Sequence, residues 1–176
     1  MISRKIADRI NDQIQREMHS AYLYLGMSAK MAEKGYHGAA KWLLTQYHEE
    51  MFHAMKFYGY LLDQGASVEL KPIPAPELKT ADFKEIFQKV LEHEKSITKS
   101  VTEILALARG ESDFATEAFA QWYVNEQIEE EKNASEILQN LDLLGGSQQG
   151  IFMLNSELGK RVSSAPLNFL EIEGAH

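Results

Sequence analysis

Two residues in the middle of the second long amphipathic segment, Glu50 and His53, have the types and spacing that could hold a metal ion. Residues three apart on an α-helix project from one face, so this carboxylate and this imidazole could bind the same ion. The apolar positions around them follow the 4-3-4-3 spacing of a helix face packed against a core. Glu50 takes one of these core positions, although Glu is almost never fully buried without a partner. The pattern therefore indicates a buried metal ligand.

Three further segments also carry an acidic or amide side chain at a position where an apolar core residue is expected. Each has the helical spacing of a core face, and each carries a carboxylate or an amide near the middle of that face. A residue in the middle of a helix lies at mid-depth whichever way the helix runs, so we expect these side chains to share one layer. We call this set the acidic layer; its members are Glu17, Glu50, Glu94, Gln127 and Glu130.

The charges of the acidic layer indicate a metal site. No Lys or Arg lies on the four core faces, so we expect no cation of the protein to neutralise the buried acids. Two divalent cations would balance their charge. Oxygen ligands with one imidazole suit iron or manganese, and the lack of cysteine excludes thiolate sites, disulfides and iron–sulfur clusters.

The segments that must position these residues are predicted to be long helices. Gly35, Gly65 and Gly145 follow three of them, and Asp82 with Glu85 resembles a capping box at the start of another. The expected spans are about 5–34, 39–64, 82–108 and 113–144, with a short fifth helix at 148–158.

The connections between these helices set the topology. The first and third links are only a few residues long, which favours antiparallel hairpins. The link over 65–80 holds Pro72, Pro74 and Pro76 and is predicted to be extended. Its residues can reach about 50 Å, more than the roughly 40 Å length of the second helix. We therefore predict an all-α four-helix bundle with one long crossover, which makes the second and third helices parallel.

Length and composition are those of a globular protein. We expect a single domain over 1–176, with the bundle at about 5–144 and a loose tail after residue 166. The net charge of −8 argues against nucleic acid as a partner and suits the attraction of cations. No long apolar run and no signal peptide is found, so we expect no membrane partner and a cytoplasmic location.

Specific motifs resemble the bacterial non-haem ferritins. The chain keeps Glu17, Glu94 and the motif Glu50-Met51-Phe52-His53, but it lacks a second Glu-x-x-His motif in the fourth helix. That helix carries Glu126-Gln127-Ile128-Glu129-Glu130 instead, preceded by Gln121-Trp122-Tyr123-Val124, and both stretches look like that family. The resemblance covers most of the chain and implies a ferritin-like bundle.

The resemblance also implies roles for individual residues. Glu17, Glu50 and His53 would hold a first iron, and Glu50, Glu94 and Glu130 a second, with Gln127 lining the site. A third iron site would be formed with Glu130 by three further residues, Glu49, Glu126 and Glu129. From the sequence alone, those three are more typical of a solvated acidic face than of a metal site. Tyr24 would be either a redox-active tyrosine or a core tyrosine bonded to a carboxylate. We expect His93, beside Glu94, to face solvent.

By the same resemblance, the protein would store iron and have ferroxidase activity, oxidising ferrous iron with O2 or H2O2. It would form a hollow homo-oligomer of twenty-four subunits. The chain could instead be a bacterioferritin, which would carry the second Glu-x-x-His motif and haem. The missing motif disfavours haem, but Met51 occupies the position of that family's haem-ligating methionine, so haem is not excluded. It could also be a rubrerythrin-like peroxidase, which would usually carry a four-cysteine site, or a metal-free helical interaction module.

Overall fold

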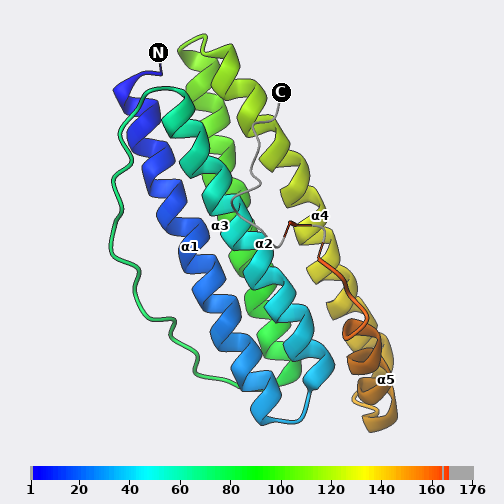
Figure 1. The fold of residues 1–176 in the computed structure, drawn as a ribbon. Helices are drawn as coiled ribbons and strands as arrows, with labels where there is room; N and C mark the ends of the chain where they lie inside the picture. The colour runs from blue at the N-terminus through cyan, green and yellow to red at the C-terminus, as the bar shows by residue number, and fades with distance from the viewer. Residues whose placement is uncertain (1, 164, 167–176) are drawn as a thin grey trace.

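The protein is an all-helical bundle (Figure 1). The computed structural model describes residues 2–163, 165 and 166, and these contain no β-strand. The predicted spans agree with the observed helices to within two residues at each end. The helices are α1 (Arg4–Glu33), α2 (His37–Asp63), α3 (Phe83–Gly110), α4 (Phe114–Leu144) and α5 (Gln148–Leu158).

The long connection between α2 and α3 runs back along the bundle beside α1, so α2 and α3 are parallel (Figure 1). Asn11 of α1 holds the start of this long connection in place. The Asn11 Nδ2 donates to the Ser67 carbonyl at 3.0 Å, and its Oδ1 accepts from the Glu69 backbone N–H at 2.7 Å. The predicted crossover is therefore confirmed, and α1–α2 and α3–α4 are antiparallel pairs.

Side-chain caps and a glycine in the left-handed conformation determine where these helices begin and end, with one difference from the prediction. The Asp82 side chain accepts from the Glu85 backbone N–H at 3.0 Å, which caps α3. The reciprocal half of the expected capping box is made by Thr80 instead of Glu85, since Thr80 Oγ1 accepts from the Asp82 N–H at 3.0 Å. Gly145 adopts the left-handed conformation, with φ 55°, and ends α4.

The apolar core consists of two clusters, one toward each end of the bundle. One includes Tyr24, Leu43, Phe87 and Ile137, and the other includes Ile10, Phe57, Val101 and Tyr123. On every long helix, the residues of the acidic layer fall between the stretches that form these two clusters. The prediction that the misplaced acids share one layer is therefore confirmed.

Helix α5 packs against the start of α2. The Asn155 Oδ1 accepts from the Ala39 backbone N–H at 2.9 Å and so caps α2, whose own N-cap residue makes no side-chain cap. A Cβ at Gly38 would lie 1.7 Å from the Asn155 carbonyl oxygen, so only glycine permits this approach. After α5 the chain turns back toward the middle of the bundle (Figure 1). The predicted loose tail, after residue 166, lies outside the described residues.

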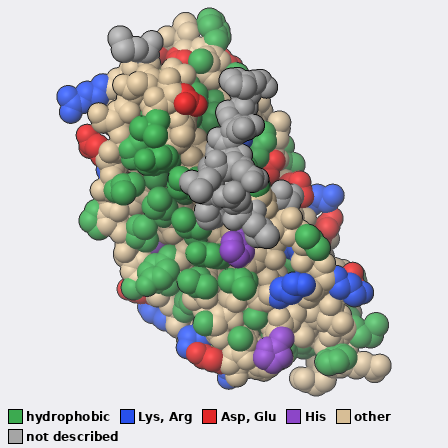
Figure 2. All heavy atoms as spheres, in the orientation of Figure 1, with side chains coloured by type: hydrophobic (Ala, Val, Ile, Leu, Met, Phe, Trp, Pro, Cys, Tyr) green, Lys and Arg blue, Asp and Glu red, His purple; other side chains and the backbone are tan. Residues whose placement is uncertain are grey.

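An apolar face covers part of α1, α2 and the long connection; Figure 2 shows hydrophobic side chains gathered there. It includes a groove of about 320 Å³ lined by Met18, Ala21, Tyr22, Leu25, Tyr47, Met51 and Ile73. Met51 thus lines this outer groove and not the acidic layer. None of the described helices combines the length and apolar character that crossing a membrane requires.

Candidate metal centre

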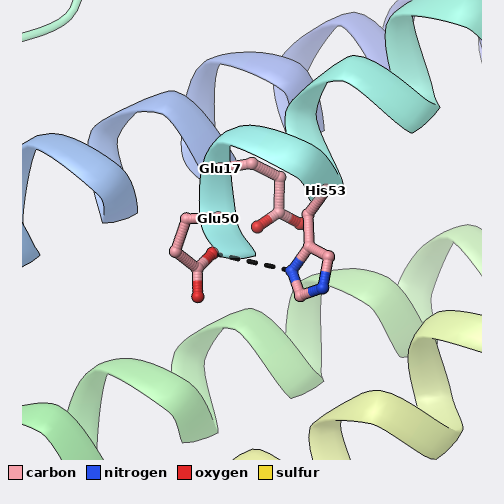
Figure 3. Close-up of side chains that lie close together, drawn as sticks. All are labelled: Glu17, Glu50 and His53. Atoms are coloured by element: carbon pink, nitrogen blue, oxygen red, sulfur yellow. Dashed lines mark ion pairs between the residues drawn. The ribbon is translucent and has the colours of Figure 1, made fainter. Parts of the chain in front are cut away.

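Glu17, Glu50 and His53 form the centre of the acidic layer. Glu17 comes from α1, while Glu50 and His53 come from successive turns of α2, and all three point into the space between the helices (Figure 3). One ligand atom from each lies within 4.8 Å of the others, and the Glu50 Oε2 is 3.8 Å from the His53 Nδ1. Their exposed fractions are only 1%, 1% and 4%. This geometry suits one divalent cation held by two carboxylates and an imidazole.

The other half of the acidic layer comes from α3 and α4. Glu94 and Glu130 are buried, with exposed fractions of 1% and 6%, and Gln127 is buried on the core face of α4, one turn before Glu130. The Gln127 Nε2 donates to the Glu94 Oε2 at 2.9 Å. The structure thus brings all five predicted residues of the layer into the core.

Buried amides orient the carboxylates. The Gln13 Nε2 donates to the Glu17 Oε1 at 2.7 Å, and the Gln46 Nε2 donates to the Glu130 Oε2 at 2.8 Å. The other oxygen of Glu17, Oε2, is buried and has no hydrogen-bond partner among the described residues. A neutral amide therefore fixes one oxygen of the Glu17 carboxylate and leaves the other available to a cation.

The buried carboxylates hold protons more tightly than exposed ones. Burial raises the pKa of Glu17 well above its ordinary value, and the negative charge of Glu50 raises it further. Burial, followed by the charges of Glu94 and Glu130, raises the pKa of Glu50. Burial, followed by the charge of Glu94, raises the pKa of Glu130 to about 7. The ionised layer is thus unfavourable without a cation to neutralise it.

Tyr24 and His93 lie beside Glu94. The Tyr24 hydroxyl donates a hydrogen bond to the Glu94 Oε1, as one of the two sequence-based interpretations expected. The prediction for His93 was wrong: it is half-buried, its Nε2 lies 2.7 Å from the Ser20 Oγ, and its ring contacts Tyr24 edge-on. The packing of α1 against α3 covers this face of α3, which the spacing within α3 could not show.

Aromatic side chains surround His53. The Tyr123 hydroxyl donates to the His53 carbonyl oxygen at 2.8 Å. The rings of Trp122 and Tyr123 each lie edge-on to the imidazole, with centroids 5.6 Å away. Packing on these sides limits the rotation of the imidazole and holds it toward the carboxylates.

The three residues assigned to the third iron site lie around one cavity. Glu49 is buried, Glu126 is half-buried and Glu129 is exposed. They line a cavity of about 160 Å³, together with His53 and Glu130. The structure therefore brings this cluster beside the acidic layer, rather than spreading it over a solvated face.

A basic side chain lies beside the acidic layer at this cavity, although no Lys or Arg comes from the core faces of the four long helices. Arg161, which follows α5, lies with its Nη2 2.6 Å from the Glu49 Oε2. Nothing in the spacing of the sequence indicates this contact, because the two residues are 112 positions apart. Gln13 and Gln46 were also not predicted as site residues, although Gln13 falls on the core face of α1 one turn before Glu17.

Comparisons with known proteins agree with this geometry. The family model of the ferritin-like domain matches residues 7–144. A Haemophilus influenzae protein named "Probable bacterial non-heme ferritin-like protein" is 38% identical over 165 residues, which cover 94% of this chain and 100% of that protein. The bacterial non-heme ferritin of Staphylococcus aureus is 31% identical over 161 residues, covering 92% and 97% of the two chains.

Solved structures of ferritins have the same fold. The open-pore ferritin of the archaeon Archaeoglobus fulgidus is 38% identical with a TM-score of 0.90, covering 92% of this chain and 100% of that one. A closed form engineered from the Archaeoglobus fulgidus ferritin is 37% identical, also with a TM-score of 0.90, covering 93% and 100%. The chain therefore belongs to the ferritin-like family, with bacterial non-haem ferritins among its relatives.

Proposed function

We propose that this protein stores iron and oxidises it on the way into storage, as a ferroxidase. The observation that carries the proposal is the acidic layer, in which buried carboxylates from all four long helices lie with His53 between two apolar clusters. Iron is the substrate and cargo of this reaction. Membership of the ferritin-like family supports iron storage independently of the side-chain geometry.

Two ferrous ions would share the layer. Glu17, Glu50 and His53 would hold the first, which is consistent with the distances among their ligand atoms. Glu50, Glu94 and Glu130 would hold the second, with Gln127 as a neutral neighbour. Glu50 would thus bridge the two ions, because it lies between the two halves of the layer.

The chemistry requires a pair of metals and an oxidant. Two ferrous ions together supply the two electrons that reduce O2 to peroxide, or H2O2 to water. The protein's part is to hold both ions at fixed positions and to keep the carboxylates oriented through Gln13, Gln46 and Gln127. Tyr24 would exchange a proton or an electron with the site, and its hydrogen bond to Glu94 supports this role.

The oxidised iron would leave through the third site. Glu49, Glu126 and Glu129 offer oxygen ligands around the adjacent cavity, and Glu130 belongs to both sites. We further propose that the protein assembles into a hollow homo-oligomer, of twenty-four subunits, that holds the ferric mineral. The similarity to ferritins across nearly the whole chain supports this assembly.

The variant Glu50→Ala tests the proposal. Loss of the bridging carboxylate should reduce the rate of ferrous oxidation at least about a hundredfold, since both ions lose a ligand. The helices should remain folded with unchanged or greater stability, because a buried charge is removed. Stopped-flow absorbance after anaerobic loading with two ferrous ions per subunit measures the rate, and circular dichroism measures folding.

The matched control is Glu92→Ala, which removes an exposed carboxylate of α3 near Glu94 in sequence. This variant should oxidise iron like the unaltered protein. Normal oxidation by the Glu50→Ala protein would show that the acidic layer is not the ferroxidase site.

A further inference from the structure

Glu49 is held by the chain segment that follows α5. The Arg161 Nη2 lies 2.6 Å from the Glu49 Oε2, and the Ser163 hydroxyl lies 3.4 Å from the Glu49 Oε1. The Glu49 side chain is only 7% exposed and the Arg161 side chain 19%. Both oxygens of Glu49 therefore have partners in residues 161 and 163, and the partner of Oε2 is a cation whose positive charge opposes the approach of a metal ion.

Other contacts hold this segment in place. The guanidinium carbon of Arg161 lies 4.6 Å from the centroid of the Trp42 ring, a cation–π contact. The Lys41 Nζ donates to the Gly159 carbonyl at 2.8 Å. The Arg161 Nη1, however, is buried and has no hydrogen-bond partner among the described residues. The pairing with Glu49 thus uses only part of the guanidinium's donor capacity, and it is weaker than a fully bonded pair.

The positive charge of Arg161 partly neutralises the carboxylates of this cavity, as a bound metal ion would. Arg161 lines the same cavity as Glu49, Glu126, Glu129 and Glu130, where four carboxylates would otherwise lie together. Its positive charge opposes the rise that burial causes in the pKa of Glu130. Of the described residues that line this cavity, Arg161 is the only one with a basic side chain of fixed charge.

An adjoining cavity gives the guanidinium somewhere to move. This open cavity, of about 530 Å³, is also lined by Arg161 and carries the carboxylates of Glu136 and Glu157. Both are exposed, so an arginine turned toward them would exchange a buried pair for solvated ones. A change of side-chain conformation at Arg161 would be enough to release Glu49 without unfolding a helix.

We propose that Arg161 is a built-in counter-ion that occupies Glu49 until a metal ion displaces it, and so controls entry of iron into the third site. This inference rests on the proposed function. The guanidinium neutralises Glu49 while the third site is empty. An arriving metal ion binds the Glu49 carboxylate, and the Arg161 side chain rotates toward Glu136 and Glu157. The segment after α5 therefore sets the affinity of the third site.

The test compares Arg161→Gln with Lys30→Gln in anaerobic calorimetric titrations with ferrous iron. Both variants remove one positive charge, but Lys30 pairs with Glu33, at 3.1 Å, and lines neither of the two cavities. Arg161→Gln should bind the third ferrous ion per subunit at least about tenfold more tightly than the unaltered protein. Lys30→Gln should behave like the unaltered protein, and adding Glu49→Gln to Arg161→Gln should abolish the gain.

Hydrogen–deuterium exchange of the unaltered protein provides a second measurement that does not depend on a variant. Peptides covering 159–163 should exchange faster when a third ferrous ion per subunit is added to protein that already holds two. Unchanged exchange on binding of the third ion, or an unchanged third affinity in folded Arg161→Gln, would overturn the inference. Binding of no ferrous ions to the unaltered protein would instead overturn the proposed function.

Discussion

Individual side chains of the acidic layer combine burial with unfavourable charge. Burial first, and neighbouring carboxylates second, raise the pKa values of Glu17, Glu50 and Glu130. A carboxyl whose pKa is raised by folding keeps a proton that the unfolded chain has lost. The metal-free protein therefore loses stability as the pH rises through this range, and a bound cation removes the cause of the loss.

The first prediction concerns pH. Glu130 has a pKa of about 7 in the folded protein and an ordinary value of 4.5, so its contribution to stability falls between those two pH values. Below pH 4.5 the Glu130 carboxyl is protonated in both the folded and the unfolded chain, so a further fall in pH adds no stability. The Tm of chelator-treated protein should therefore fall by at least about 3 °C between pH 5.5 and pH 7.5.

The variant Glu130→Gln provides the comparison for this measurement, because it cannot titrate at that position. Its Tm should depend less on pH over the same interval. With excess ferrous iron under nitrogen, the dependence of the unaltered protein should reverse, since protons compete with the metal. An equal slope in both metal-free proteins would contradict the assigned role of Glu130.

The second prediction concerns the buried amides. Gln46→Leu removes the donor that holds the Glu130 Oε2 and leaves a residue of similar size. We expect about a tenfold loss of affinity for the second ferrous ion, because a ligand without its outer hydrogen bond is less well oriented. Affinity for the first ion should be almost unchanged. Calorimetric titration measures both, and Gln121→Leu, at an exposed position of α4, is the control.

At the scale of the helices, the bundle depends on contacts between elements as well as on helix propensity. The two apolar clusters hold the four long helices at both ends, and the acidic layer is fixed between them. Asn11 attaches the long connection to α1, and Asn155 attaches α5 to α2. These two asparagines act as caps or clamps for backbone groups that no helix satisfies internally.

The third prediction tests the contact between α5 and α2. Asn155→Ala removes the side-chain acceptor for the Ala39 N–H, and should reduce the free energy of unfolding by about 1 kcal/mol. The control is Asn140→Ala, at an exposed position near the end of α4. Denaturant unfolding followed by circular dichroism measures both. Equal stabilities for the two variants would show that the cap on α2 contributes nothing.

At the scale of the whole molecule, the proposed function has iron pass through the acidic layer and not stay there permanently. The proposed second iron would have only carboxylates as ligands, whereas the first would also have the imidazole of His53. Further carboxylates lie around the adjoining cavity, which Glu130 also lines. Oxidised iron that leaves the acidic layer would therefore meet hard oxygen ligands next to it.

The fourth prediction follows from this route. When iron is added in portions of two ferrous ions per subunit, the first portion should be oxidised quickly and an immediate second portion slowly. The rate should recover with the interval between additions, as ferric ions leave the layer. Stopped-flow absorbance measures the rate, and Mössbauer spectra follow the ferric pair. A ferric pair that persists while later portions are oxidised at full speed would identify a stable cofactor instead.

Much of this protein is determined by local patterns in its sequence. The spacing of apolar residues predicts the helices, and the mid-helix positions of Glu17, Glu50, Glu94 and Glu130 place them at one depth, since helix geometry is regular. The proline-containing connection is long enough to return along the bundle, which determines the crossover. The assignment of individual ligands, the single domain and the cytoplasmic location stay predictions.

Tertiary structure alone decided the contacts that surround these acids. Arg161 reaches Glu49 across 112 positions, and Asn155 reaches Ala39 across 116. The burial of His93 likewise depends on how α1 packs against α3. No local periodicity records such pairings, because they depend on where the short fifth helix docks and on the path of the chain after it. The sequence therefore determined the layer of acids, and the packing of distant segments decided that a protein cation holds Glu49 beside it.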